Sequence, residues 1–249
     1  VFCEKIFWAG VPFREYITLY SQTGSRPWFR KIFGQLNMRL FGLLLLLPWV
    51  ALCKEEAIPL FDGKTLNGWS DKGGGQPGAG WVAEDGCIVR KEKAGDLYSK
   101  RSFKDFEFSF EWKIVVGCNS GVKYRVTDYS GAVLGPEYQI LDDAKWKYVP
   151  DHIGATASIY AIKPAGAEKK LNPPGSFNKS RVVANGKRIE HWLNGEKVAE
   201  IEIDSDDWKK RHAASKFRKR PDFGSKKGRF MLQEHGGKVW YRNLMIREF

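Results

Sequence analysis

The chain has 249 residues, which allows one domain or two small ones. Its hydrophobic content of 43% and aromatic content of 14% are typical of a globular core and exclude a disordered chain. Part of the formal net charge of +12 is concentrated in one basic run, Lys209–Lys227. Because such a loop is usually a solvated surface, we expect it to be exposed, and we do not expect a nucleic-acid partner.

The first interpretable element in chain order is residues 38–53, MRLFGLLLLLPWVALC. Met38 and Arg39 give a positively charged start, and an apolar run follows as far as Leu52. This order is typical of a signal peptide, and the run is shorter than the about 20 apolar residues of a membrane span. We therefore expect an exported protein with no stable membrane span after processing.

The segment before the apolar run, residues 1–37, shows no clean period. Because export machinery reads an N-terminal signal, we expect translation to start at Met38 and residues 1–37 to be a non-native extension. The alternative is a genuine cytoplasmic tail before an uncleaved anchor. Cleavage after Cys53 would give a periplasmic or extracellular protein, and a lipoprotein acylated at Cys53 is the alternative that the bulky Leu52 disfavours.

From about Ile58 onward the hydrophobic pattern has a period of two. The clearest case is 106–114, where aromatic and aliphatic residues alternate with polar ones, which predicts a half-buried strand. The segments 121–128 and 136–141 show a similar alternation. These patterns predict strands rather than helices.

Turn residues divide the later part of the chain. Asn-Gly pairs at 185–186 and 194–195 predict a three-stranded meander whose strands cover 179–184, 187–193 and 197–203. Gly236-Gly237 predicts one more hairpin, which joins the strands 229–234 and 239–246. The segment 208–219 is predicted as a short helix or a loop.

Together these elements predict an all-β domain over residues 58–249. Roughly a dozen strands without helical crossovers favour antiparallel sheets packed as a two-sheet jelly-roll sandwich. Cys87 and Cys118 would remain after signal removal. An exported protein can keep a disulfide, but two small buried thiols fit the sequence equally well.

Six segments occur in the order of one known family: LFDGKTLNGW (60–69), WVAEDGCI (81–88), NSGVKYRV (119–126), PEYQILDD (136–143), HWLNG (191–195) and MLQEHGGKVWYRNLMI (231–246). In this order the sequence resembles the 3-keto-disaccharide hydrolase domain family over about residues 58–249. The resemblance implies a concanavalin A-like jelly roll and the cleavage of glycosides whose sugar carries a 3-keto group.

The chemistry of a 3-keto sugar sets the groups that such a site needs. The ketone acidifies the proton at C2, so a base can remove it, the C1 substituent then leaves, and water can add afterwards. This route needs a base, a group that stabilises the enolate and an acid for the leaving oxygen. Direct hydrolysis would instead need two carboxylates that flank the bond.

Candidate proton-transfer groups occur in two of the six segments. Glu137 and Gln139 share one face of a predicted strand, and a bulge could return Asp142 to that face. Gln233 and His235 share the polar face of another predicted strand. We expect Glu137 or His235 to be the base, Asp142 the acid, and Gln139 and Gln233 to bind substrate. The alternative is that both acids are ordinary residues at a strand end.

Further candidates are expected to bind substrate. Arg125 shares a strand face with Lys123 and would stabilise developing negative charge. Asn119 would hold a hydroxyl or build a turn, and Trp146 would stack on a sugar ring. The metal question stays open, with a divalent ion held by His152 together with the glutamate and the other histidine as one option.

Strand parity then predicts where these side chains meet. Glu137, Gln139, Arg125, Gln233 and His235 are expected in one concave polar pocket, with the basic run directed away from it. A non-catalytic carbohydrate-binding module and a structural adhesion domain are the competing classes. An acid pair beside a histidine favours catalysis over binding alone, and the predicted partner is a sugar or glycoside.

Overall fold

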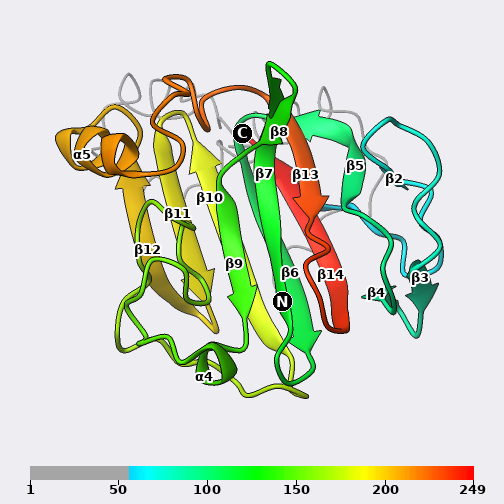
Figure 1. Ribbon diagram of the computed structural model, residues 1–249. Coiled ribbons are helices and arrows are strands. Elements are labelled where there is room, and N and C mark those ends of the chain that lie inside the picture. The colour runs from blue at the N-terminus through cyan, green and yellow to red at the C-terminus, as the bar shows by residue number, and fades with distance from the viewer. Residues whose placement is uncertain (1–55) are drawn as a thin grey trace, which may run out of the picture. The chain divides into compact units, whose positions relative to one another are not determined.

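The structure, a computed structural model, describes residues 56–249 (Figure 1). The expected extension 1–37 and the expected signal peptide 38–53, with its cleavage site, lie outside the described residues. Within residues 56–249, no helix has the length and apolar character needed to cross a membrane. The described strands form two antiparallel sheets packed face to face, as expected for a concanavalin A-like jelly-roll sandwich.

The larger sheet has eight strands in the order β12-β11-β10-β6-β14-β4-β3, with β1 also paired to β14. Its strands are β1 (Ile58–Pro59), β3 (Trp81–Glu84), β4 (Cys87–Arg90), β6 (Phe106–Ile114), β10 (Asn178–Asn185), β11 (Arg188–Leu193), β12 (Glu196–Glu202) and β14 (Val239–Glu248). The predicted meander is confirmed as β10, β11 and β12, with Gly186 and Gly195 in the turns at positive φ.

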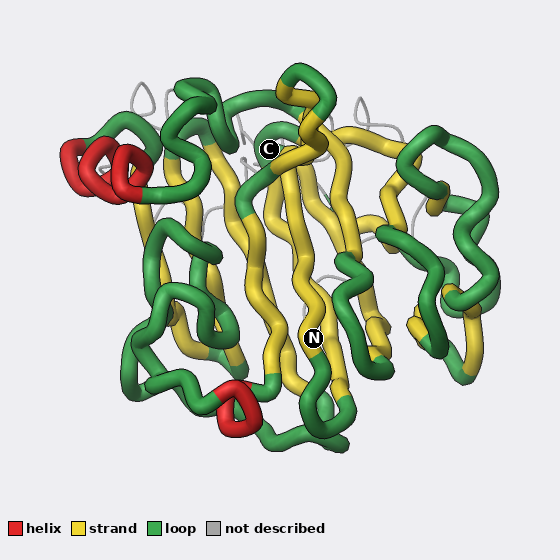
Figure 2. Tube along the Cα trace, in the orientation of Figure 1, coloured by secondary structure: helices red, strands yellow, loops and turns green. Residues whose placement is uncertain are grey.

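The smaller sheet has six strands in the order β2-β5-β13-β7-β8, and β9 pairs with β7 beside β8. Its strands are β2 (Trp69–Ser70), β5 (Leu97–Phe103), β7 (Asn119–Tyr129), β8 (Ala132–Leu134), β9 (Glu137–Leu141) and β13 (Gly228–Leu232). Two short helices, α4 (Asp143–Trp146) and α5 (Asp206–Ala214), lie in the connections (Figure 2). The α5 helix begins after the capping residue Ser205, two residues before the segment 208–219 that was predicted as a helix or a loop, and covers the first half of it.

The core lies between the two sheets and is strongly aromatic. The predicted half-buried strand is confirmed as β6, where five alternate side chains from Phe106 to Ile114 are buried. The Phe108 ring lies 4.4 Å from that of Phe230 on β13 (centroid to centroid), and the Phe106 ring lies 4.9 Å from it. Contacts of this kind hold the large sheet against the small one.

The predicted hairpin at Gly236-Gly237 is wrong. The strand before it, β13, belongs to the six-stranded sheet, whereas β14 belongs to the eight-stranded sheet. Gly237 is needed for a different reason, because a Cβ at this position would lie 2.7 Å from Cα of Cys118. Arg90 holds this crossing in place by pairing with Glu234 and donating to the carbonyl of Gly237 at 2.8 Å.

The two cysteines of the described residues, Cys87 and Cys118, are free and buried. Burial raises the pKa of the Cys118 thiol to about 12. Of the two interpretations left open by the sequence, the structure therefore has the small buried thiols.

One histidine belongs to the core. The His191 ring lies between the sheets, with Nε2 2.9 Å from the Tyr124 hydroxyl and Nδ1 3.0 Å from the carbonyl oxygen of Ala157. The carbonyl oxygen can only accept, so the neutral ring donates from Nδ1 and accepts the hydroxyl proton at Nε2. Burial lowers the pKa of His191 to about 4.

This histidine is expected to make the fold sensitive to acid. The unfolded state takes up the proton near pH 6.5 and the folded state only near pH 4, so stability present above pH 6.5 is lost as the pH falls through this window. The loss from this residue is roughly 2 to 3 kcal/mol at pH 4.5. Urea unfolding of His191→Gln at pH 7.5 and 4.5 should show a pH dependence smaller by that amount. An unchanged dependence would contradict the assignment.

Candidate functional site

A cluster of polar side chains lies on the face of the six-stranded sheet that is turned away from the core. Tyr124 and Tyr138 reach across to the other sheet, where their hydroxyls contact His191 and Ser180. Alternation along β7 and β9 therefore puts their neighbours Lys123 and Glu137 on the opposite, outer face. We call this group the outer-face cluster: Asn119 and Lys123 on β7, Glu137 and Gln139 on β9, and Gln233 just after β13.

The pairing of β7 with β9 brings the members of the outer-face cluster into contact. Glu137 lies opposite Lys123 and Gln139 lies opposite Gly121. The Lys123 Nζ is 3.7 Å from Oε2 of Glu137, and Gln139 Nε2 donates to Asn119 Oδ1 at 3.5 Å. On the other side of β7, the backbone N–H of Gln233 donates to the carbonyl of Gly121 at 2.9 Å.

Gly121 makes room for the carboxyl group at the centre of the cluster. A Cβ at this position would lie 2.3 Å from Oε1 of Glu137. The carboxyl group thus lies over a stretch of β7 that carries no side chain. From there it is within reach of the residues on both neighbouring strands.

Burial controls the protonation of Glu137, which is only 4% exposed. Desolvation raises the pKa of this carboxyl above its ordinary value, and the negative charge of Asp96 acts in the same direction. The cations Lys123 and Lys216 oppose the rise in pKa without cancelling it. A carboxyl group with a raised pKa beside an ammonium group is suited to proton transfer.

Three groups near Glu137 were not proposed as site residues from the sequence. Asp96 precedes β5 and its Oδ1 accepts from the N–H of Glu234 at 2.9 Å, next to the end of β13. Tyr160 donates its N–H to the carbonyl of Glu137 at 3.0 Å, and the Lys216 Nζ lies 4.3 Å from the centre of the Tyr160 ring. All three residues lie in loops, where the sequence shows no hydrophobic period from which the direction of a side chain could be predicted.

The expectation that Arg125 belongs to this site is wrong. A bulge opposite Arg229–Met231 puts Arg125 at a φ of +48°. Its side chain therefore does not lie on the same face of the sheet as the side chain of Lys123. The guanidinium is buried and makes four hydrogen bonds. Nε donates to the carbonyl of Lys104 at 2.6 Å and Nη1 to the carbonyl of Gly224 at 3.0 Å. Nη2 donates to the carbonyl of Gly186 and to Oδ1 of Asp105, both at 3.1 Å. It has a structural role.

Asp142 is not placed as an acid catalyst either. It is the capping residue of α4, and one carboxylate oxygen accepts from the N–H of Lys145 at 3.3 Å. The other oxygen accepts from the N–H of Gly117 at 2.7 Å. With both oxygens bound to backbone donors, this carboxylate stabilises a turn and a helix end.

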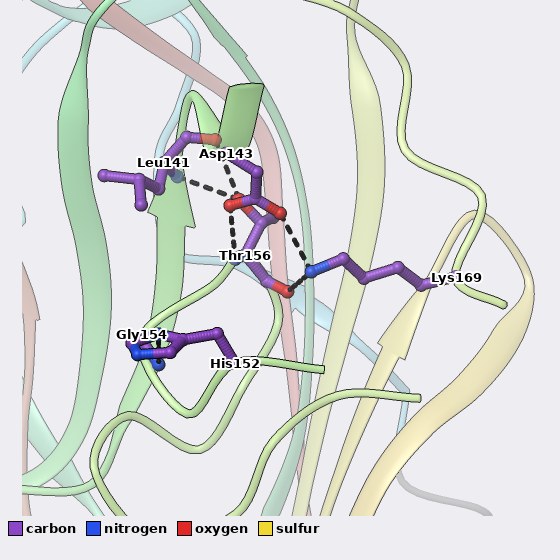
Figure 3. Close-up of polar contacts among 6 residues, drawn as sticks. All are labelled: Leu141, Asp143, His152, Gly154, Thr156 and Lys169. Carbon is purple, nitrogen blue, oxygen red and sulfur yellow. Dashed lines mark hydrogen bonds and ion pairs between the residues drawn. The ribbon is translucent and has the colours of Figure 1, made fainter. Parts of the chain in front are cut away.

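The remaining aromatic candidates do not join the outer-face cluster. His235 is exposed in the loop after β13 and makes no hydrogen bond among residues 56–249. Trp146 is 46% exposed at the end of α4. His152 accepts the N–H of Gly154 at Nδ1, at 3.0 Å (Figure 3). Its ring stacks on that of Tyr148.

The metal site considered from the sequence is not formed. Among the residues that the structure describes, no group of three histidine, cysteine, aspartate or glutamate side chains is placed to hold a metal ion. His152, Glu137 and His235 are therefore not brought together as a set of ligands.

A buried polar network fastens the loop after β9 (Figure 3). Asp143 pairs with Lys169 at 2.9 Å, and the Lys169 ammonium, 3% exposed, also donates to the carbonyl of Thr156 at 2.8 Å. The Thr156 hydroxyl in turn donates to the carbonyl of Leu141 at 2.8 Å. The network keeps this loop along the free edge of β9, where it also supplies Tyr160.

The basic run is only partly as expected. Arg218 and Lys219 are exposed, but Phe217 and Phe223 stack on each other at 4.0 Å and are buried. Lys216, the residue before this anchor, extends over Tyr160 toward the outer-face cluster. The run is therefore not directed wholly away from the candidate site.

The geometry at Gly121 leads to a direct prediction. Gly121→Ala is expected to leave the melting temperature within a few degrees, because the atom that must move is the end of a flexible side chain. The displaced carboxyl of Glu137 should lower activity by at least about tenfold, since misplacing a reacting group by about 1 Å can cost on the order of 10²-fold. Steady-state kinetics and thermal melts of this variant test the role of the bare stretch of β7. The control is Gly166→Ala, where the nearest atom to the added Cβ is the Val198 carbonyl oxygen at 3.8 Å. Full activity in Gly121→Ala would contradict it.

Solved structures share this fold. A protein of Parabacteroides distasonis, provisionally classed as a glycosyl hydrolase, is 34% identical with a TM-score of 0.70, and the match covers 78% of this chain and 94% of that one. A second protein of that organism with the same provisional class is 26% identical with a TM-score of 0.60, over 78% of this chain and 100% of that one. The chain is thus a carbohydrate-active protein with a jelly-roll fold.

The particular family follows from two further matches. The profile of the 3-keto-alpha-glucoside-1,2-lyase-like domain matches residues 56–247. A Bacteroides thetaiotaomicron protein named 3-keto-disaccharide hydrolase is 31% identical over 225 residues, which is 76% of this chain and 77% of that protein. The chain belongs to the 3-keto-alpha-glucoside-1,2-lyase-like domain family, and the resemblance seen in its six sequence segments is confirmed.

Proposed function

We propose that this protein cleaves 3-keto-glycosides, with Glu137 as the base that removes the proton from C2. The observation that carries the proposal is the position of the Glu137 carboxyl: nearly buried, over Gly121 and 3.7 Å from the Lys123 ammonium. Family membership supports the substrate class, since the related Bacteroides protein is named for hydrolysis of 3-keto-disaccharides.

The residues of the outer-face cluster have different roles in this reaction. Glu137 takes the C2 proton, and the electron pair of the C2–H bond moves into the enolate of the 3-ketone. Lys123 stabilises the negative oxygen of this enolate. The C1–O bond then breaks, its electron pair leaves with the glycosidic oxygen, and a C1–C2 double bond forms. Addition of water across that bond gives the free 3-keto sugar.

The leaving oxygen and the sugar hydroxyls need further groups. Asp96 acts on Glu137 as a negative charge and has no proton to give, so we assign the protonation of the leaving oxygen to Glu137, which carries the proton taken from C2. The amides of Asn119, Gln139 and Gln233 are suited to hold sugar hydroxyls, and Gln233 Oε1 is a buried oxygen without a hydrogen-bond partner in the described structure. The proposal includes export, on the evidence of the apolar segment 38–53.

The test uses two chromogenic substrates that differ only at C3. The protein is incubated with p-nitrophenyl 3-keto-α-glucoside and with p-nitrophenyl α-glucoside, and release of nitrophenol is followed. Release from the keto substrate alone, slowed by deuterium at C2, is expected. Equal release from both would indicate direct hydrolysis, and tight binding without release would make this a carbohydrate-binding module.

A further inference from the structure

We propose that the candidate site takes glycosides that carry a negative charge, and that Lys216 is the residue that recognises this charge. The inference rests on the proposed function, because it names the substrate class of the same site. It begins from the position of Lys216 between two anchored residues. Ser215 and Phe217 are both buried, and the Ser215 hydroxyl accepts from the N–H of Phe217 at 3.0 Å.

This anchoring fixes where the lysine can reach. The buried Phe217 stacks on Phe223, so the backbone on either side of Lys216 is held against the core. The exposed Lys216 side chain lies with its Nζ 4.3 Å from the centre of the Tyr160 ring. Tyr160 in turn is joined to Glu137 by a backbone hydrogen bond of 3.0 Å. The ammonium is therefore held at the rim of the outer-face cluster.

Lys216 has no acidic partner of its own. Within residues 56–249 it forms no ion pair, although three acids lie in the same part of the chain. Asp206 pairs with Lys209, Asp207 pairs with Arg211 and Lys163, and Asp222 pairs with Lys226. These acids are thus already engaged by other cations.

The Glu137 carboxylate is not an ion-pair partner of Lys216 either. Its side chain is 5% exposed and its ion-pair contact is with Lys123, whereas Lys216 acts on it only through space. The cations that follow Phe217 in the basic run make no contact with the outer-face cluster in the described part of the chain. Lys216 is therefore an unpaired cation beside the site.

An unpaired cation in this position attracts and orients anionic ligands. A carboxylate or phosphate on the sugar or on the leaving group would contact Lys216 and leave the C2 proton for Glu137. A neutral glycoside would bury the site without using this cation. We therefore expect the enzyme to prefer an anionic 3-keto-glycoside over its neutral counterpart.

The experiment compares substrates and variants in pairs. The neutral probe is p-nitrophenyl 3-keto-α-glucoside, and the anionic probes carry a carboxylate on the nitrophenyl ring or, as the 3-keto-glucuronide, at C6. The values of kcat/KM are measured for the wild type, Lys216→Met and Lys219→Met. The last variant loses the same charge three residues away, at an exposed position. Taking the ratio of substrates within each variant allows for differences in their intrinsic reactivity.

We expect Lys216→Met to lower the preference for at least one anionic probe by about fivefold or more, because a single ion contact in a partly exposed site is worth about 1 kcal/mol. The neutral probe and the Lys219→Met variant should change by less than twofold. Added salt should weaken the preference of the wild type. Equal ratios in all three proteins, or equal losses in both variants, would overturn the role of Lys216.

The outcome separates this inference from the proposed function. Cleavage of the neutral probe without any effect of Lys216→Met would leave the function and remove the inference. If none of the keto substrates is cleaved, the function fails, and calorimetric titration with glucuronate and glucose then decides the inference. Equal affinities for these two sugars in the wild type would overturn it.

Discussion

Replacement of Glu137 by glutamine is expected to lower turnover of 3-keto-glycosides by about 10²- to 10⁴-fold while the sandwich stays folded. The amide keeps the volume of the side chain over Gly121 but cannot accept the C2 proton. Substrate binding should change much less, since the amides of Gln139 and Asn119 are untouched. Steady-state kinetics, with Glu111→Gln on the eight-stranded sheet as the matched control, measure the effect.

The same variant should reveal the ionisation of Glu137 through stability. Burial raises the pKa of this carboxyl in the folded state, so the folded protein binds the proton more tightly than the unfolded chain. Stability from this group is therefore present at low pH and is lost as the pH rises through the folded pKa. The melting temperature of Glu137→Gln should therefore rise relative to that of the wild type as the pH is raised from 4 to 8. A constant difference, or wild-type kinetics in the variant, would refute the assigned role.

The second large effect concerns Arg125. Arg125→Met is expected to lower the free energy of unfolding by about 3 to 5 kcal/mol, because it removes the cation from a buried polar site. Three carbonyl groups and Asp105 lose their donor, while methionine fills part of the space. Urea denaturation measures the loss. Arg101→Met, which breaks an exposed pair with Glu248, should cost less than about 1 kcal/mol.

The result for Arg125 also separates the two interpretations of this residue. The sequence suggested a substrate-binding role, which would appear as lost activity in a protein of normal stability. The structure instead predicts lost stability, with the kinetic constants of the protein that remains folded near those of the wild type. Normal stability together with a large loss of activity would favour the earlier interpretation.

Strand alternation was a reliable guide wherever no bulge interrupted it. On β6 every second residue is buried from Phe106 to Ile114, as the pattern predicted. On β7 the same rule put Lys123 on the polar face of the strand, where the structure has it, opposite Glu137. It failed at Arg125, because the bulge adds one residue and shifts the parity. Nothing in the local sequence marks that bulge, since arginine is not a residue that favours positive φ.

The candidate site was predictable to the extent that strands build it. Glu137, Gln139, Asn119 and Gln233 stand on or beside paired strands, and the structure brings them to one face. Asp96 and Lys216 come from loops whose course depends on distant contacts, such as the stacking of Phe217 on Phe223. Asp142 misled because its spacing after Gln139 fits a bulged strand as well as it fits a helix cap.

The position of β14 has a consequence for how this domain forms. It comes last among the strands of the domain, yet it lies near the middle of the large sheet, between β6 and β4 (Figure 1). Until its ten residues are available, β6 and β4 have no neighbour on their facing edges. A chain that folded before Glu248 was made would expose these two strand edges to other chains, so the large sheet can be completed safely only once the last strand has been synthesised.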